Sequence, residues 1–101
     1  MDLDELSNRI EKISSLYAQE FNIKRDNDWF FLKVQEELGE LTQKYLMITG
    51  RGREKGITQE EIRECMEYEL ADLFCQVLLI ANHYDINLIK RIKEKWFKEP
   101  K

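Results

Sequence analysis

The chain has 101 residues, of which 43% are hydrophobic and 36% charged, and this composition predicts one folded domain spanning residues 1–101 rather than a disordered chain. The formal net charge of −4 argues against a nucleic-acid partner, because nucleic-acid binding needs a basic face. No apolar run reaches transmembrane length and the opening MDLDELSNRI does not resemble a signal peptide, so we expect a cytoplasmic protein that does not contact membranes.

The first half of the chain predicts two helices. The first has an apolar residue at every third or fourth position: Leu3, Leu6, Ile10, Ile13, Tyr17 and Phe21. The polar segment 22–28 is predicted to be a linker. A second helix is predicted from about Asp28 to Thr49, because its apolar residues recur with the same period.

The second half predicts two further helices. GRGREKG, residues 50–56, has the composition of a flexible basic loop. Thr58 and Glu61 then have the spacing of a capping box, which begins a third helix that we expect to continue to about Tyr84. After a break at residues 85–87, a short fourth helix ends in RIKEKWFK. The sequence therefore predicts an all-α bundle of four to five helices.

Three glutamates gather in the second predicted helix, in the stretch EELGE. With side chains placed about 100° apart, Glu37 lies at the edge of the apolar stripe, Glu40 one step further round and Glu36 beyond it. Lys33 and Lys44 share this face and could pair with the glutamates four residues away. Taken alone, this pattern favours a solvent-exposed face with salt bridges.

The third predicted helix changes this interpretation. ELADLFCQVLLIA, residues 69–81, is apolar nearly all round, as in a central buried helix. Its polar members are Glu69, Asp72 and Gln76, and Glu69 falls within the apolar stripe. A buried carboxylate is costly unless it has a cation, a lysine or a proton as partner. This helix therefore needs something to neutralise Glu69.

A divalent metal would meet that need if several carboxylates converge. Glu69 and Asp72, at i and i+3, face one way, and Glu37 and Glu40 have the same spacing on the preceding helix. Two such pairs would form a cage of oxygen ligands, which selects hard cations such as Mg²⁺ or Mn²⁺. A di-iron centre would need a Glu-x-x-His motif, and the only histidine, His83, lacks a glutamate three residues before it.

Gly39 lies in the middle of the second predicted helix, where glycine costs about 1 kcal/mol relative to alanine. We interpret it as a point of close approach by a neighbouring backbone, as a site built across two helices would require. The alternative is a tolerated surface glycine.

EELGE (36–40) followed by ELAD (69–72) resembles the paired motif of the MazG-like family of all-α nucleoside triphosphate pyrophosphohydrolases, Glu-Glu-x-x-Glu on one helix and Glu-x-x-Asp on the next. The resemblance covers roughly residues 28–98. It implies the all-α NTP pyrophosphatase fold with a carboxylate metal site between the second and third helices. It also implies hydrolysis of the α–β phosphate bond of a (deoxy)nucleoside triphosphate, which releases a monophosphate and pyrophosphate.

The resemblance also implies roles for the acidic residues. Mg²⁺, for which Mn²⁺ could substitute, would be held by Glu37, Glu40, Glu69 and Asp72. Glu36 and Glu37 would have catalytic roles, with Glu36 binding a second metal or orienting the attacking water.

Substrate contacts are predicted from outside the acidic motifs. The segment KEKW, residues 93–96, loosely matches an Asn-x-Lys-Phe motif of some relatives, with lysine in place of asparagine. Its lysines have an alternative role, because basic residues suit a helix C-terminus. An aromatic side chain before the acidic helix could stack on a base, and an amide one turn after Asp72 could bind a base edge. The candidate substrate-binding residues are Trp29, Lys33, Gln76, Lys95 and Lys98.

Two other functions stay open. Phosphoribosyl-ATP pyrophosphohydrolases belong to the same superfamily and have similarly short chains. A non-catalytic, dimeric helical interaction module could retain the acidic core, and pairing of Glu69 with a lysine would favour it. Relatives form dimers and tetramers, so the resemblance implies a homodimer or a dimer of dimers.

Overall fold

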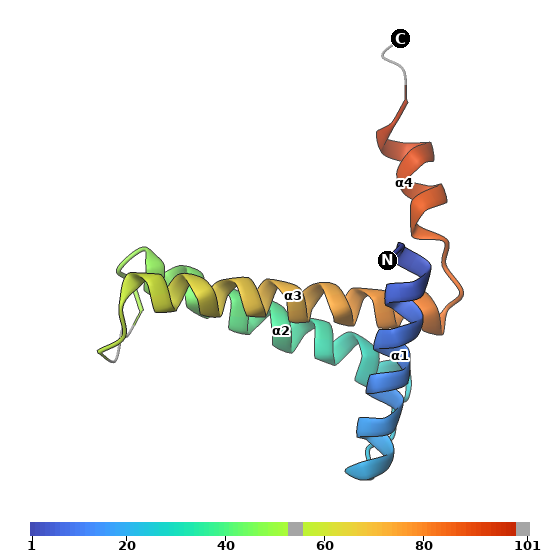
Figure 1. The fold of residues 1–101 in the computed structure, drawn as a ribbon, viewed down its shortest axis with the longest axis horizontal. Helices are drawn as coiled ribbons and strands as arrows, with labels where there is room; N and C mark the ends of the chain where they lie inside the picture. The colour runs from blue at the N-terminus through green and yellow to red at the C-terminus, as the bar shows by residue number, and fades with distance from the viewer. Residues whose placement is uncertain (53–55, 99–101) are drawn as a thin grey trace.

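The structure is a computed structural model that describes residues 1–52 and 56–98. Within these ranges it has four helices and no strand, so the predicted all-α class is confirmed (Figure 1). The helices are α1 (Leu3–Glu20), α2 (Asn27–Ile48), α3 (Gln59–His83) and α4 (Leu88–Trp96). The basic loop predicted at 50–56 lies partly outside the described residues. None of the described helices is long and apolar enough to cross a membrane.

Side-chain caps determine where the helices begin. The Thr58 hydroxyl accepts a hydrogen bond of 3.1 Å from the Glu61 backbone N–H, which confirms the predicted start of α3. The Asp26 carboxylate accepts one of 2.8 Å from the Trp29 N–H. Because of this cap, α2 begins within the predicted linker, which ends earlier than the sequence pattern indicates.

The antiparallel α2–α3 hairpin is the main structural unit (Figure 1). The α1 helix crosses the hairpin near the C-terminal end of α3, and α4 extends away from it. The core is correspondingly small, and its buried apolar residues are Ala18, Phe30, Met47, Ile62, Leu78, Leu79 and Ala81.

One chain does not form the closed bundle expected from the sequence. The radius of gyration is 16.6 Å, whereas a compact domain of this length has about 13 Å. Only α2 and α3 pack along their length, because α1 contacts one end of the hairpin and α4 directs its isoleucines Ile89 and Ile92 to solvent. Many large apolar side chains are therefore exposed, including Leu38, Leu70 and Phe74.

Candidate metal centre

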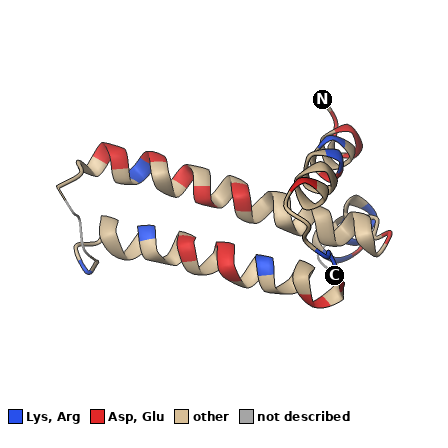
Figure 2. Ribbon diagram, turned by 90° about the horizontal axis from the view of Figure 1, so that it is seen from below, with Lys and Arg blue, Asp and Glu red and all other residues tan. Residues whose placement is uncertain are grey.

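Three carboxylates from the two long helices meet on one side of the hairpin. Glu37 and Glu40 of α2 and Glu69 of α3 each offer an oxygen atom, and these three atoms all lie within 4.8 Å of one another. Figure 2 shows acidic residues along both helices of the hairpin. The structure thus brings together three of the four predicted metal ligands, of which Glu69 lies 29 residues after Glu40 and 32 residues after Glu37 in the sequence.

Polar atoms in this cluster are buried without a partner among the described residues. They are Oε2 of Glu37, Oε2 of Glu69 and Oε1 of Gln76. An unsatisfied buried carboxylate oxygen costs several kcal/mol unless a cation or a proton neutralises it. The cluster therefore favours binding of a positively charged species.

The pKa values of two glutamates in this cluster are raised by burial and by repulsion between the carboxylates. Burial, followed by the negative charges of Glu40, Asp72 and Glu69, together raise the pKa of Glu37 to about 7. Burial also raises the pKa of Glu69, with hydrogen bonding and charge repulsion from Glu40 as the next causes. Near neutral pH, part of the cluster holds a proton in the absence of another cation.

The nearby lysines oppose this repulsion only partly. The charge of Lys33 lowers the pKa of Glu37, and that of Lys44 lowers the pKa of Glu69, but each is the smaller influence. The sequence assigned no site role to Lys44. Its position four residues after Glu40, on the same helix face, is the signal that places it beside the cluster.

Asp72 and Glu36 lie at the periphery. Asp72 is exposed and does not belong to the group of three mutually close oxygens, although its charge raises the pKa of both Glu37 and Glu69. Glu36 is exposed, and one of its oxygens lies 3.1 Å from Lys33 Nζ. Lys33 therefore pairs at i, i+3 with Glu36, whereas the sequence indicated pairing at i, i+4 with Glu37.

The predicted substrate-binding residues are divided between two regions. Gln76 lies on the carboxylate side, with its Oε1 atom buried and unpartnered among the described residues. Trp29, at the start of α2, packs edge-to-face on Phe30 with ring centroids 5.1 Å apart. Lys95 lies on α4 and Lys98 just beyond it, so the structure of one chain leaves both away from the carboxylates (Figure 1).

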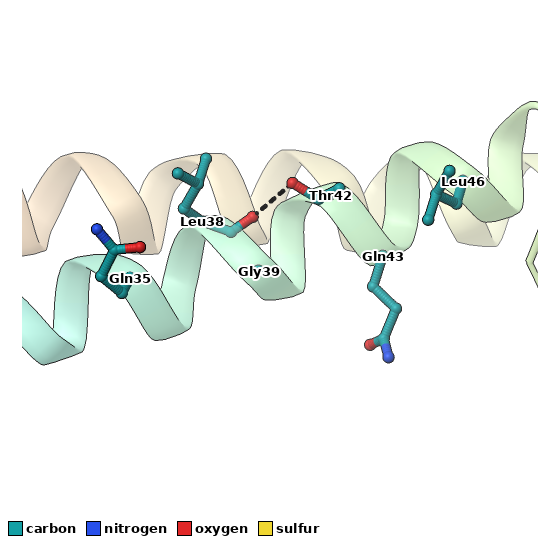
Figure 3. Close-up of a pocket in the computed structure, with 6 residues that line it drawn as sticks. All are labelled: Gln35, Leu38, Gly39, Thr42, Gln43 and Leu46. Carbon is teal, nitrogen blue, oxygen red and sulfur yellow. Dashed lines mark hydrogen bonds between the residues drawn. The ribbon is translucent and has the colours of Figure 1, made fainter.

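Gly39 does not mark a close approach within the chain, and that interpretation was wrong. A Cβ atom at this position would meet no heavy atom within 4 Å. The glycine instead lies in a shallow hollow of about 410 Å³ on the outer side of α2, lined also by Gln35, Leu38, Thr42, Gln43 and Leu46 (Figure 3).

This open position predicts the effect of adding a side chain. We expect Gly39→Ala to raise the free energy of unfolding by about 0.5–1 kcal/mol, because alanine restricts the unfolded chain and meets no obstacle in the helix. Urea unfolding at low protein concentration measures it, with Thr42→Ala on the same helix face as the comparison. A loss of stability would show that a neighbour from outside the single chain approaches this backbone.

Comparison with protein-family models, with curated proteins and with solved structures finds no match. The family resemblance consequently remains a prediction from the two acidic motifs. The convergence of Glu37, Glu40 and Glu69 is independent of that resemblance, since it is a property of the fold.

Proposed function

We propose that this chain is a Mg²⁺-dependent nucleotide pyrophosphohydrolase of the MazG-like type, which hydrolyses the α–β phosphate bond of (deoxy)nucleoside triphosphates to a monophosphate and pyrophosphate. The observation that carries the proposal is the meeting of Glu37, Glu40 and Glu69 between two helices, where one oxygen of Glu37 and one of Glu69 are buried without a partner among the described residues. These residues belong to the same two motifs on which the family resemblance rests.

The donor set fits Mg²⁺ or Mn²⁺. All candidate ligands are carboxylate oxygens, which hard divalent cations prefer, and the burial and mutual repulsion that raise the pKa values of Glu37 and Glu69 would be offset by a bound cation. Glu37, Glu40 and Glu69 would hold the ion, with Asp72 as a further ligand beside them. A bound ion supplies charge neutralisation for the phosphates and polarises the phosphoryl group.

The remaining side chains would position the substrate. An acidic cluster repels a triphosphate, so the substrate can bind only with its cations, and Lys33 adds positive charge at the edge of the cluster. Glu36, which Lys33 holds by the 3.1 Å ion pair, would orient the attacking water. Gln76 would accept a hydrogen bond from a base amine through Oε1, which has no partner within residues 1–52 and 56–98.

One observation favours the non-catalytic module as a second candidate. Lys44 is close enough to Glu69 for its charge to lower the pKa of that carboxyl, which is the lysine pairing that a metal-free acidic core would use. The two functions differ in their response to Mg²⁺. A metal site predicts that Mg²⁺ raises the melting temperature, whereas a core neutralised by lysine predicts no response beyond that of ionic strength.

The direct test is an assay of canonical and modified nucleoside triphosphates with Mg²⁺, in which monophosphate and pyrophosphate are both quantified. We expect equal amounts of the two products, and we expect Asp72→Asn to reduce both because its charge acts on Glu37 and Glu69. Asp85→Asn is the matched control, since Asp85 lies in the turn after α3 at φ 53°, which asparagine tolerates.

Other products would contradict the proposal. Release of inorganic phosphate instead of pyrophosphate would exclude α–β hydrolysis. No turnover of any triphosphate would direct the assay to phosphoribosyl-ATP. Failure there too, with a melting temperature that still rises in Mg²⁺, would leave a metal-stabilised interaction module.

A further inference from the structure

The α4 helix separates its apolar from its charged residues more sharply than the other three helices do. Ile89, Ile92 and Trp96 recur at intervals of three and four residues, so they form one stripe, which we call the apolar face of α4. Their exposed fractions are 46, 42 and 75%, and α4 extends away from the hairpin (Figure 1). The apolar face of α4 is therefore open to a partner.

Lysines border this face on both sides. With about 100° between successive residues, Lys93 lies about 40° beyond Ile89 at one edge, and Lys95 lies about 60° beyond Ile92 at the other. A lysine in such a position can lay its methylene groups along the apolar stripe while its ammonium group extends past it. Both edges of the face can thus present positive charge in the same direction as the apolar side chains.

The positive charge of this segment is not neutralised within the described part of the chain. Glu94 is its one acidic residue, and it forms an ion pair of 2.8 Å with Arg91 on the far side of the helix. Four lysines make no ion pair with any described residue: Lys90, Lys93, Lys95 and Lys98. With five basic residues and one acidic residue, residues 88–98 carry a net charge of +4, whereas the whole chain carries −4 and the remainder therefore −8.

A membrane that contains anionic lipids has the complementary arrangement. An apolar layer lies directly below a plane of negatively charged headgroups, so a helix in that plane buries its apolar side while lysines at both edges reach the phosphates. Tryptophan is favoured at this boundary, which suits the exposed Trp96. A nucleic acid would pair with the lysines but would leave Ile89 and Ile92 in water.

We propose that α4 attaches this chain to anionic membrane surfaces, with its apolar face inserted among the lipid headgroups and its lysines on the lipid phosphates. The expectation of no membrane contact rested on the lack of a spanning segment, and a helix that lies in the plane of the surface needs none. The acidic hairpin would stay in water, since α4 extends away from it. The inference does not depend on the proposed enzymatic function.

Flotation of the purified full chain with lipid vesicles tests the proposal. We expect binding to vesicles of phosphatidylcholine and phosphatidylserine in equal amounts, and little binding to phosphatidylcholine alone, because each basic residue near an anionic surface favours binding about fivefold. Raising the ionic strength to about 1 M, where the Debye length is about 3 Å, should release most of the bound chain.

Two double variants separate the apolar from the electrostatic contribution. Ile92→Ser/Trp96→Ser should weaken binding to the anionic vesicles about a hundredfold, because two large side chains no longer leave water. Lys93→Gln/Lys95→Gln should weaken it about 25-fold, through the loss of two positive charges.

The matched control variants lie on α1. Ile13→Ser/Leu16→Ser and Arg9→Gln/Lys12→Gln alter exposed residues of the same kinds and should leave binding to the vesicles unchanged. Circular dichroism verifies that each variant is folded before it is mixed with lipid.

Fluorescence gives a second readout from the helix itself. In Trp29→Phe the only tryptophan is Trp96, and phenylalanine retains an aromatic ring beside Phe30. The emission of Trp96 should shift to shorter wavelength with the anionic vesicles and stay unchanged with phosphatidylcholine.

Four results would overturn the proposal. They are no binding to the anionic vesicles, equal binding to neutral and anionic vesicles, folded α4 variants that bind as the wild type does, and a loss of binding in the α1 controls as large as in the α4 variants. In a chain that binds neither kind of vesicle, a dimer that Ile92→Ser/Trp96→Ser dissociates in sedimentation velocity would assign the apolar face of α4 to a second copy instead.

Discussion

Replacing Glu69 by Gln is expected to lower Mg²⁺-dependent release of pyrophosphate by about a thousandfold. Glu69 contributes one of the three converging oxygens, and its Oε2 atom is buried with no partner in the part of the chain that the structure describes. A metal ion that stabilises the charge of a transferring phosphoryl group is worth several kcal/mol, and about 4 kcal/mol corresponds to three decades in rate. The neutral amide keeps the volume of the side chain but removes the charge that would hold the ion.

The matched control is Glu64→Gln, an exposed glutamate on the same helix and outside the cluster. It should retain the activity of the wild type. Calorimetric titration with Mn²⁺ gives a second readout, because Glu69→Gln should weaken ion binding even where turnover is too slow to measure. Full activity in a folded Glu69→Gln protein would remove the carboxylate cluster from the reaction.

The second large effect is a loss of stability as the pH rises, in the absence of divalent ions. Burial and repulsion raise the pKa of Glu37 from 4.5 to about 7 in the folded chain. Between these two values the folded chain keeps a proton that the unfolded chain has lost, so unfolding releases a proton and the free energy of unfolding falls with increasing pH. The stabilising contribution is complete below about pH 4.5 and is lost above about pH 7.

Solvent screening limits the size of this pH-dependent change in the free energy of unfolding. A shift of this size in a fully buried group would be worth about 3 kcal/mol, but screening around a partly exposed cluster reduces it to on the order of 1 kcal/mol. For a domain of about 100 residues this corresponds to a fall in melting temperature of about 4–8 °C. Thermal unfolding at pH 5 and pH 8, in buffer with a chelator, measures the difference.

A Glu37→Gln variant and added Mg²⁺ test whether Glu37 causes this pH dependence of stability. Glu37→Gln should raise the melting temperature at pH 8 and flatten the dependence between pH 5 and pH 8, whereas Glu64→Gln should change neither. Mg²⁺ should restore stability to the wild type at pH 8 but not to Glu37→Gln. A melting temperature that is equal at both pH values would show that the cluster exerts no such repulsion.

Together these two predictions describe a carboxylate cluster that destabilises the metal-free protein and that a bound cation would stabilise. Glu69→Gln and Glu37→Gln should each abolish the stabilising effect of Mg²⁺, and Glu37→Gln should at the same time make the metal-free chain more stable. Such opposite effects on stability and activity are typical of functional sites and are not expected of salt bridges on a solvent-exposed face.

Much of the site follows from local sequence. The Thr58 cap, the helical periodicity and the i, i+3 spacing of the carboxylates depend on interactions between near neighbours, which repeat in any helix with that sequence. The burial of the Glu69 Oε2 atom is also predictable, because Glu69 falls within the apolar stripe of α3. From these features the sequence predicts that carboxylates of the two helices converge, and the structure shows this for Glu37, Glu40 and Glu69.

The details at the edge of the site depend on side-chain conformation. Lys33 can reach carboxylates at i+3 and i+4, and helical spacing alone does not decide between them; in the structure it pairs with Glu36. Asp72 has the spacing of a ligand, yet it remains exposed, because it is turned further from the helix interface than Glu69.

The sequence by itself determined the helices, their caps and the two acidic motifs, since each arises from contacts within a few residues. The tertiary structure alone decided that Gly39 lies open to solvent, that α4 and its lysines lie away from the carboxylates, and that an apolar face remains uncovered. The reason is physical: helical periodicity defines which residues share a face, but the crossing of α1 and the direction of α4 depend on loop geometry and on competition among several apolar faces for a small core.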